Sequence, residues 1–285
     1  MTKTIDTLVE DMLAVVDLKG GWDATVSHLF STQIKDTLET RLTPPTEERK
    51  GSLRMSNVGS PCKRKLWYHI NDPTGGEVLR PTTRLKFLFG DILEDLLVHL
   101  AIAAGHQVEG MQDEMEIEGI KGHRDCVIDG VTVDIKSASS FSFSKFKDGT
   151  LRDNDAFGYI SQLSSYVYSG KDDPIVTDKK RGAFLVIDKQ HANLCLDIHD
   201  FSKDIENKRE EVVATKALMG LPNPPAKGFD DVADGKSGNR KLATNCSYCE
   251  FKDKCWPDLR TYIYSNGPRY LTKVSREPNV MEKQK

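Results

Sequence analysis

Long apolar runs are missing from this 285-residue chain, and no stretch approaches the roughly 20 residues that cross a bilayer as a helix. The first residues, MTKTIDTLVEDML, are acidic and amphipathic and lack the apolar core of a secretory signal. Excess positive charge is also missing, because the formal net charge is -3. These absences predict a cytoplasmic protein without a membrane partner, and any contact with nucleic acid must be local.

Cysteines are few, and six in a chain of this length are too sparse for a disulfide scaffold. Three of them bunch as Cys246-x2-Cys249-x5-Cys255, and Cys62 in SNVGSPCKRKLWY is the obvious fourth thiolate. Four thiolates suit tetrahedral zinc or an iron–sulfur cluster, and ligand identity alone does not choose between them. Cys126 and Cys195 fall in apolar strand patterns and are expected to be buried.

The order of expected elements predicts an α/β protein with a mixed central sheet flanked by helices. Apolar spacing predicts a helical N-terminal segment with a linker, TPPTEERKG, within residues 1–50, and a helix over 84–104. Strands are expected near 114–119, 122–128, 131–137, 183–188 and 194–198, with helices over 157–168 and 202–219. Residues 139–155 are expected to be a loop, 51–260 the main domain, and 261–285 a C-terminal tail.

The strongest local signal is Asp129-Gly130, which stands between two alternating runs and predicts a tight hairpin. A two-residue turn there places Val133 opposite Cys126 and Asp134 opposite Asp125. Asp125, Asp134 and Lys136 then share one face, and the apolar residues share the other. Opposed like charges destabilise a sheet, and a divalent cation such as Mg²⁺ or Mn²⁺ resolves the conflict. A solvated Asp/Lys face on an exposed hairpin is the alternative interpretation.

At this point the run GHRDCVIDGVTVDIKSAS resembles the catalytic core of the PD-(D/E)XK nucleases, and especially of the RecB-like exonucleases. Asp134-Ile135-Lys136 matches the DxK element, and YISQLSSY matches the QxxxY motif with Gln162 and Tyr166. The resemblance covers about residues 55–260. It implies a restriction-endonuclease-like fold and a metal-dependent nuclease that degrades DNA from an end.

The resemblance also implies roles for individual residues. In the family a carboxylate or histidine on the preceding helix completes the metal site, and Glu94 in GDILED is the candidate, although Asp95 follows it. The implied metal ligands are Glu94, Asp125, Asp134 and Ile135. Lys136 is implied to assist the attacking water, and Gln162 and Tyr166 to position the substrate. One cysteine before the core and three after it are similar to the four-iron four-sulfur clasp of AddB-type and CRISPR-associated RecB-like proteins. We call this set, Cys62, Cys246, Cys249 and Cys255, the cysteine clasp.

Several alternatives stay open at the level of sequence. A catalytically inactive DNA-end-binding or adaptor protein, a DNA endonuclease, and a zinc-stapled interaction domain all fit parts of the pattern. Recombination, repair or phage DNA metabolism is the expected setting, with a recombinase or helicase as a partner. Short basic clusters are candidate DNA contacts, with Trp67 and Tyr68 beside the first; these clusters are Lys63-Arg64-Lys65, Lys145/Lys147 and Lys179-Lys180-Arg181.

Overall fold

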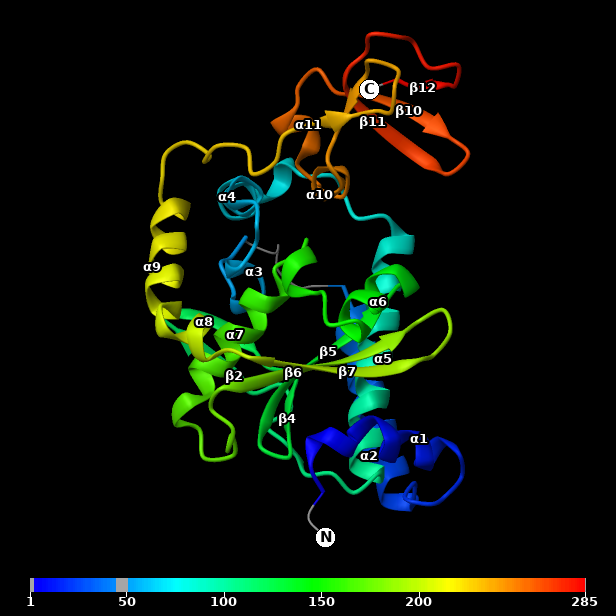
Figure 1. Cartoon of the computed structure of the whole chain (residues 1–285), viewed down its shortest axis with the longest axis vertical. Helices are drawn as coiled ribbons and strands as arrows, with labels where there is room; N and C mark the ends of the chain where they lie inside the picture. The colour runs from blue at the N-terminus through cyan, green and yellow to red at the C-terminus, as the bar shows by residue number, and fades with distance from the viewer. Residues whose placement is uncertain (1–2, 45–50, 285) are drawn as a thin grey trace. The chain divides into compact units, whose positions relative to one another are not determined.

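The computed structural model (Figure 1) describes residues 3–44 and 51–284. Contacts between residues divide the chain into two compact units. Unit 1 comprises Met1–Arg49, Arg54–Gly59 and Leu79–Val213. Unit 2 comprises Lys50–Leu53, Ser60–Val78 and Ala214–Lys285. This division differs from the expected boundaries at residues 50 and 260, because three separate segments assemble each unit.

A mixed five-stranded sheet forms the centre of unit 1, in the order β1-β4-β5-β6-β7. The pair β5·β6 is parallel, and the other neighbours are antiparallel. The predicted mixed central sheet is therefore confirmed. The strands are β1 (Val108–Glu109), β4 (Cys126–Ile128), β5 (Val131–Ala138), β6 (Arg181–Asp188) and β7 (Leu194–Asp200).

The hairpin β4–β5 has the predicted register, with Cys126 opposite Val133 and Ile128 opposite Val131. Asp129 and Gly130 both have positive φ, 49° and 80°. That conformation at both central positions is the one a type I′ turn requires, and Asp-Gly tolerates it best. The two-residue turn thus fixes which side chains face each other across the hairpin.

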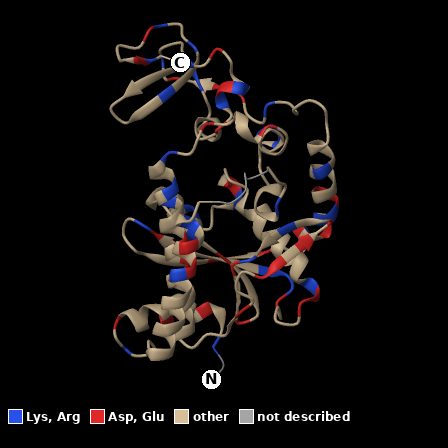
Figure 2. Cartoon of the chain, turned by 180° about the vertical axis from the view of Figure 1, so that it is seen from behind, with Lys and Arg blue, Asp and Glu red and all other residues tan. Residues whose placement is uncertain are grey.

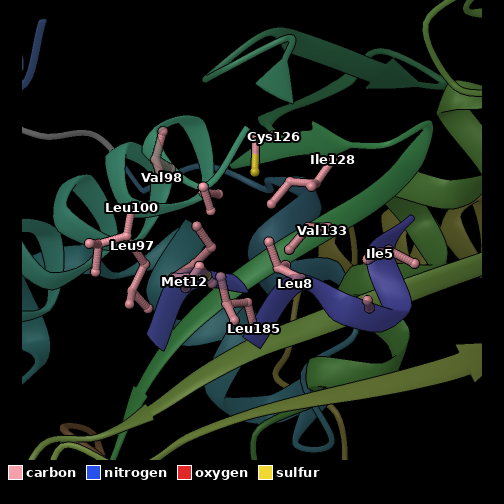
Figure 3. Packing of buried hydrophobic residues seen from close by; sticks show 14 of the residues in the cluster. Ile5, Leu8, Met12, Leu97, Val98, Leu100, Cys126, Ile128, Val133 and Leu185 are labelled. Carbon is pink, nitrogen blue, oxygen red and sulfur yellow. The ribbon is translucent and has the colours of Figure 1, made fainter. Parts of the chain in front are cut away.

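Helices from the N-terminal segment and from the middle of the chain cover one face of this sheet (Figure 1). They are α1 (Leu8–Val16), preceded by a 3₁₀ turn (Ile5–Thr7), and α5 (Pro81–Ala103), while α2 (Ala24–Leu42) packs against α5. Figure 3 shows Leu8 and Met12 lying among side chains of α5 and the sheet, and both are fully buried. The predicted helical N-terminal segment is therefore part of the core. Most of the predicted linker, residues 45–50, lies outside the described residues.

Helices α6 (Ser140–Lys147) and α7 (Tyr159–Ser169) cover the opposite face, where Leu163, Phe146 and Phe184 are buried together. The sequence predicted a loop where α6 lies, because its Ser, Phe and Lys residues carry weak helical periodicity. Ser139 caps α6, accepting a hydrogen bond from the amide of Ser142 at 3.4 Å. Smaller elements of unit 1 are α3 (Met55–Val58), α8 (Ser202–Glu206) and 3₁₀ turns at Arg152–Asn154 and Gly170–Asp172.

Two further expectations differ from the structure. The expected strand 122–128 is interrupted, because Arg124 turns inward and its guanidinium binds the carboxylates of Asp113 and Asp173, each at 2.7 Å. The residues before it form a separate hairpin of β2 (Glu114–Ile117) and β3 (Ile120–His123). The expected helix 202–219 is broken at Asn207 into α8 and α9 (Lys208–Met219).

A buried histidine connects the N-terminal segment with the turn of the β4–β5 hairpin. The ring of His106 lies 2.7 Å from a carboxylate oxygen of Asp129 through Nδ1 and 3.2 Å from one of Asp11 through Nε2. The Asp129 carboxylate also accepts a hydrogen bond from the amide of Gln107 at 3.0 Å. The Asp129 side chain of the tight turn is thus fixed by His106 and Gln107, and through His106 by α1.

Unit 2 contains a second sheet, in the order β12-β10-β11-β9-β8. The prediction of a C-terminal tail over 261–285 is wrong for much of that range, because β10 and β11 form an antiparallel hairpin there. Their pairs run from Arg260↔Leu271 to Tyr264↔Gly267. These strands are short, so alternation in the sequence was too brief to indicate them. The elements are α4 (Lys63–Asn71), a 3₁₀ turn (Pro73–Gly75), α10 (Thr244–Ser247), α11 (Lys252–Cys255), β8 (Val232–Ala233), β9 (Arg240–Lys241), β10 (Arg260–Tyr264), β11 (Gly267–Lys273) and β12 (Glu282–Lys283).

Both signs of charge are scattered along the ribbon of each unit (Figure 2), in keeping with the small net charge. Among the described helices, none has the length and apolarity needed to span a bilayer.

Candidate active site

Asp125 and Asp134 meet at the open end of the β4–β5 hairpin. Asp125 directly precedes β4 and Asp134 lies in the middle of β5, so the register continues to place them opposite each other. A carboxylate oxygen of Asp125 accepts a hydrogen bond from the amide of Ile135 at 2.6 Å. Asp134 is 1% exposed, whereas an ordinary surface carboxylate is solvated. Asp134 is therefore buried with the half-buried Asp125 opposite it, and the alternative of a solvated hairpin face does not hold.

Glu94 reaches this pair from α5. One turn before it, Gly90 lets the helix approach β5 closely, since a Cβ on Gly90 would lie 3.3 Å from the Ser137 hydroxyl. Asp95 points elsewhere, and its carboxylate accepts a hydrogen bond from the Thr37 hydroxyl of α2 at 2.7 Å. Of the two neighbouring acids, Glu94 is therefore the one that faces Asp125 and Asp134 electrostatically.

Gln112 is a neighbour of Glu94 that the sequence did not indicate. Its side-chain amide donates to a carboxylate oxygen of Glu94 at 2.8 Å, and its backbone amide donates to the carbonyl of Asp125 at 3.1 Å. Gln112 has a left-handed backbone (φ 56°) in an irregular segment. A positive φ in a residue other than glycine marks a constrained position, but sequence alone does not reveal it.

Lys136 lies on the same face of β5 as Asp134 and forms an ion pair with its carboxylate. The ammonium group also lies 5.2 Å from the ring centroid of Tyr159, at the start of α7. Burial tends to lower the pKa of Lys136, but the negative charges of Asp134 and Asp125 outweigh it and raise the pKa. Lys136 is therefore held as a cation in the metal-free chain.

The two residues of the predicted QxxxY motif both point to this group from α7. The side-chain amide of Gln162 donates to the second carboxylate oxygen of Asp134 at 3.2 Å. Tyr166 is 3% exposed, and its pKa is raised by burial and then by the charges of Asp134 and Asp125. Five side chains from four segments thus surround Asp134, namely Glu94, Asp125, Lys136, Gln162 and Tyr166. No single local sequence pattern specifies this arrangement.

The carboxylates raise one another's proton affinity. Burial, reinforced by the charge of Asp125, raises the pKa of Glu94 to about 9. Burial and the charge of Asp134 raise the pKa of Asp125 to about 7. Burial also raises the pKa of Asp134, although Lys136 acts against it. Such mutually shifted acids are typical of functional sites, because repulsion of this kind destabilises a fold unless a cation or a proton relieves it.

The donor chemistry of this group fits a hard divalent cation, for which carboxylate oxygens are preferred ligands. Within residues 3–44 and 51–284, however, no three His, Cys, Asp or Glu side chains are already arranged to hold a metal ion. Asp134 is engaged by Lys136 instead. The Ile135 side chain is buried in the core, so only its main-chain atoms can take the predicted part in a metal site.

The four residues of the cysteine clasp all belong to unit 2, and each is half-buried as a free thiol. Burial, followed by the charges of Cys62 and Cys255, raises the pKa of Cys246 to about 11. Burial likewise raises the pKa of Cys249 to about 11, with a smaller contribution from Cys62. Cys62 therefore lies within electrostatic reach of the three distant thiols. Thiolates are donors that zinc and iron–sulfur clusters take, although within residues 3–44 and 51–284 no three such side chains are already arranged to hold a metal ion.

Most of the candidate DNA-contacting cations have protein partners. Lys179 donates to the carbonyl of Gly170, Arg181 pairs with Asp178 at 2.6 Å, and Lys65 pairs with Glu250 at 3.3 Å. Trp67 donates to the carbonyl of Leu221, and Tyr68 stacks on Phe251 within unit 2. The predicted burial of Cys126 is confirmed, and Cys195 is half-buried.

No family model matches the chain, and no curated protein matches it. Among solved structures, it is similar to SSO0001, with 17% identity and a TM-score of 0.41 over 80% of this chain and 96% of that chain. It is also similar to an alkaline exonuclease, LHK-Exo, from Laribacter hongkongensis. There the identity is 16% and the TM-score 0.41, over 65% of this chain and 92% of that chain. Likeness at this level transfers no activity, so the side chains described above must support any function.

Proposed function

We propose that unit 1 is a Mg²⁺- or Mn²⁺-dependent deoxyribonuclease that hydrolyses phosphodiester bonds from a DNA end. The observation that carries the proposal is the gathering of Glu94, Asp125 and the buried Asp134 in one another's electrostatic field beside the Lys136 ammonium. Three clustered acids with raised pKa values destabilise the fold when they are ionised, and a bound divalent cation would relieve that repulsion. The resemblance of Asp134-Ile135-Lys136 and of Gln162 and Tyr166 to the RecB-like pattern supports the same activity.

Glu94, Asp125 and Asp134 would hold the metal, with a main-chain atom of Ile135. A bound Mg²⁺ or Mn²⁺ would supply an activated water and would offset negative charge on the phosphate. Lys136, whose ammonium pairs with Asp134, suits stabilisation of negative charge on the phosphate. The side chain of Gln162 fixes Asp134 through its 3.2 Å hydrogen bond, and Tyr166 closes the same side of the site.

The test is degradation of an end-labelled linear duplex in Mn²⁺, with a covalently closed circle as the matched substrate. We expect the linear DNA to be consumed and the circle to be spared. Asp134→Asn and Lys136→Ala should each reduce the rate at least 100-fold, whereas Asp95→Asn should leave the rate within a few-fold, since Asp95 faces α2. Cleavage of the circle would instead support an endonuclease. An inactive wild-type chain that still binds DNA ends would support an adaptor.

We further propose that the cysteine clasp holds a four-iron four-sulfur cluster, with zinc as the alternative occupant. The proposal rests on four half-buried thiols, of which Cys62 lies close enough to affect the pKa of each of the other three. Protein purified without oxygen should show a broad visible absorption and contain iron and sulfide, both lost in Cys249→Ser. Colourless protein with stoichiometric zinc would select the zinc alternative. Cys195→Ser is the matched control, because Cys195 lies on β7 in unit 1.

A further inference from the structure

A row of aromatic rings leads outward from Lys136. The Lys136 ammonium lies 5.2 Å from the ring centroid of Tyr159, and the Tyr159 ring lies 5.5 Å from that of Phe157, with 33° between their planes. Tyr159 is half-buried and also packs against Phe146, at 6.1 Å. Phe157 stands at the outer end and is 59% exposed. One face of an apolar ring is therefore open to solvent two side chains away from the proposed catalytic lysine.

The exposure of Phe157 is fixed by its main chain. The carboxylate of Asp155 accepts hydrogen bonds from the amides of Phe157, Gly158 and Ile160, at 3.2, 2.8 and 2.8 Å. Gly158 has φ +82°, a conformation that favours glycine, and its carbonyl accepts the first hydrogen bond of α7 from Gln162 at 2.9 Å. The turn that presents Phe157 is thus anchored to the helix that carries Gln162.

A second exposed ring and a cation lie beside this turn. Phe141 of α6 is 78% exposed, and the Lys145 ammonium lies 5.4 Å from its ring centroid. The same ammonium donates to the carbonyl of Asn154 at 3.0 Å, directly before Asp155. Exposed rings next to cations suit single-stranded nucleic acid, where bases stack on aromatics and cations meet phosphates. A purely apolar protein partner would not call for Lys136 and Lys145 around the rings.

We propose that Phe157, backed by Tyr159, stacks on the base of the nucleotide at the reacting end of the DNA strand, while Lys145 lies near its backbone. This binding site rests on the proposed nuclease function and adds a requirement to it. The requirement is a terminal base, because the last base of a strand has one face that no stacked neighbour covers and that Phe157 can reach. Phe157 thereby holds the strand in register with Lys136 and the carboxylates.

The experiment measures binding of oligonucleotides that carry 2-aminopurine at the 5′ or at the 3′ terminus, using the full chain. Ca²⁺ and the Asp134→Asn background prevent cleavage during the measurement. We expect the fluorescence of one of the two labelled ends to change on binding, and Phe157→Ala to remove that change and weaken binding roughly 5- to 150-fold. Phe157→Trp should restore both. Phe87→Ala, which removes a 55% exposed ring from α5, should bind like the parent protein.

An abasic terminal nucleotide separates base stacking from every other contact. With that substrate the penalty for Phe157→Ala should disappear, because there is no base to stack. An equal penalty on normal and abasic ends, or unaltered binding by Phe157→Ala, would overturn the stacking site while leaving the nuclease proposal intact. Failure of the wild-type chain both to bind these oligonucleotides and to cut linear DNA would overturn the nuclease proposal itself.

Discussion

The amide of Ile135 donates a hydrogen bond of 2.6 Å to the carboxylate of Asp125, across the open end of the β4–β5 hairpin. Ile135 stands between Asp134 and Lys136 in the chain, and its side chain faces the core. Ile135 thus contributes its side chain to the core and its amide to the position of the Asp125 carboxylate. Asp125 is held in place even though the charge of Asp134 raises its pKa.

The metal-free chain should lose stability as the pH rises. The pKa of Asp125 is raised from 3.8 to about 7 and that of Glu94 from 4.5 to about 9, so the folded state binds these protons more tightly than the unfolded state. Their contribution is fully present below about pH 4 and is lost progressively up to about pH 9. Urea unfolding in EDTA at pH 5 and pH 9 measures it. The loss should be much smaller in the double variant Glu94→Gln/Asp125→Asn; an equal loss in both proteins would contradict the prediction.

Asp125→Asn should stabilise the metal-free protein at pH 9, since it removes a buried charge that repels Asp134. One pKa unit corresponds to ~1.4 kcal/mol, and we expect a gain of about 1–3 kcal/mol in the free energy of unfolding. The same variant should no longer be stabilised by Mn²⁺. Asp188→Asn is the control of opposite sign, because hydrogen bonds from Gln190, His191 and Ser140 overcome burial and lower the pKa of Asp188. Thermal unfolding with and without Mn²⁺ measures both variants.

The N-terminal helix should contribute to stability as any core element does. Met12 is fully buried against α5 and the sheet, and Met12→Ala should cost about 2–5 kcal/mol of unfolding free energy. Leu18, two residues beyond the end of α1, is 92% exposed. Leu18→Ala should therefore change the stability by less than about 0.5 kcal/mol. Similar effects of the two substitutions on chemical unfolding would show that α1 does not pack as described.

Gly122→Ala should disturb the active site through Tyr166. A Cβ at this position would lie 2.7 Å from the Met55 Cβ and 2.9 Å from the Tyr166 hydroxyl oxygen, which is closer than atoms pack. Relief of this overlap should cost about 1–3 kcal/mol of stability and lower the nuclease rate. Gly220→Ala is the control, because its Cβ would meet nothing closer than 3.5 Å. Wild-type stability and rate in Gly122→Ala would contradict the described packing of Tyr166.

Local chemistry explains which features were predictable from sequence. The register of the hairpin followed from Asp129-Gly130, because two residues with positive φ leave a single pairing. The shared helix face of Gln162 and Tyr166 followed from helical spacing, and their place beside Asp134 was implied by the resemblance to the QxxxY motif. Glu94 was proposed over Asp95 from the resemblance alone, because the direction of each side chain depends on how α2 and α5 pack and on the space left by Gly90.

Features that depend on distant contacts escaped prediction. Arg124 interrupts the expected strand because its guanidinium forms an ion pair with Asp173, about 50 residues away in the chain. Gln112 reaches Glu94 from an irregular segment, and α6 depends on burial of Phe143 and Phe146 more than on periodicity. The sheet of unit 2 joins strands of two to seven residues, each too short to carry its own pattern.

The contacts of His106 connect the first helix to the turn that sets Asp125 opposite Asp134, although the two lie more than 100 residues apart in the sequence. Asp11 and Asp129 each contact a different ring nitrogen of His106. Displacement of α1 would therefore remove one of the contacts that support the Asp129-Gly130 turn. Truncation, fusion or partner binding at α1 would therefore alter the relative positions of Asp125 and Asp134 without contacting either residue.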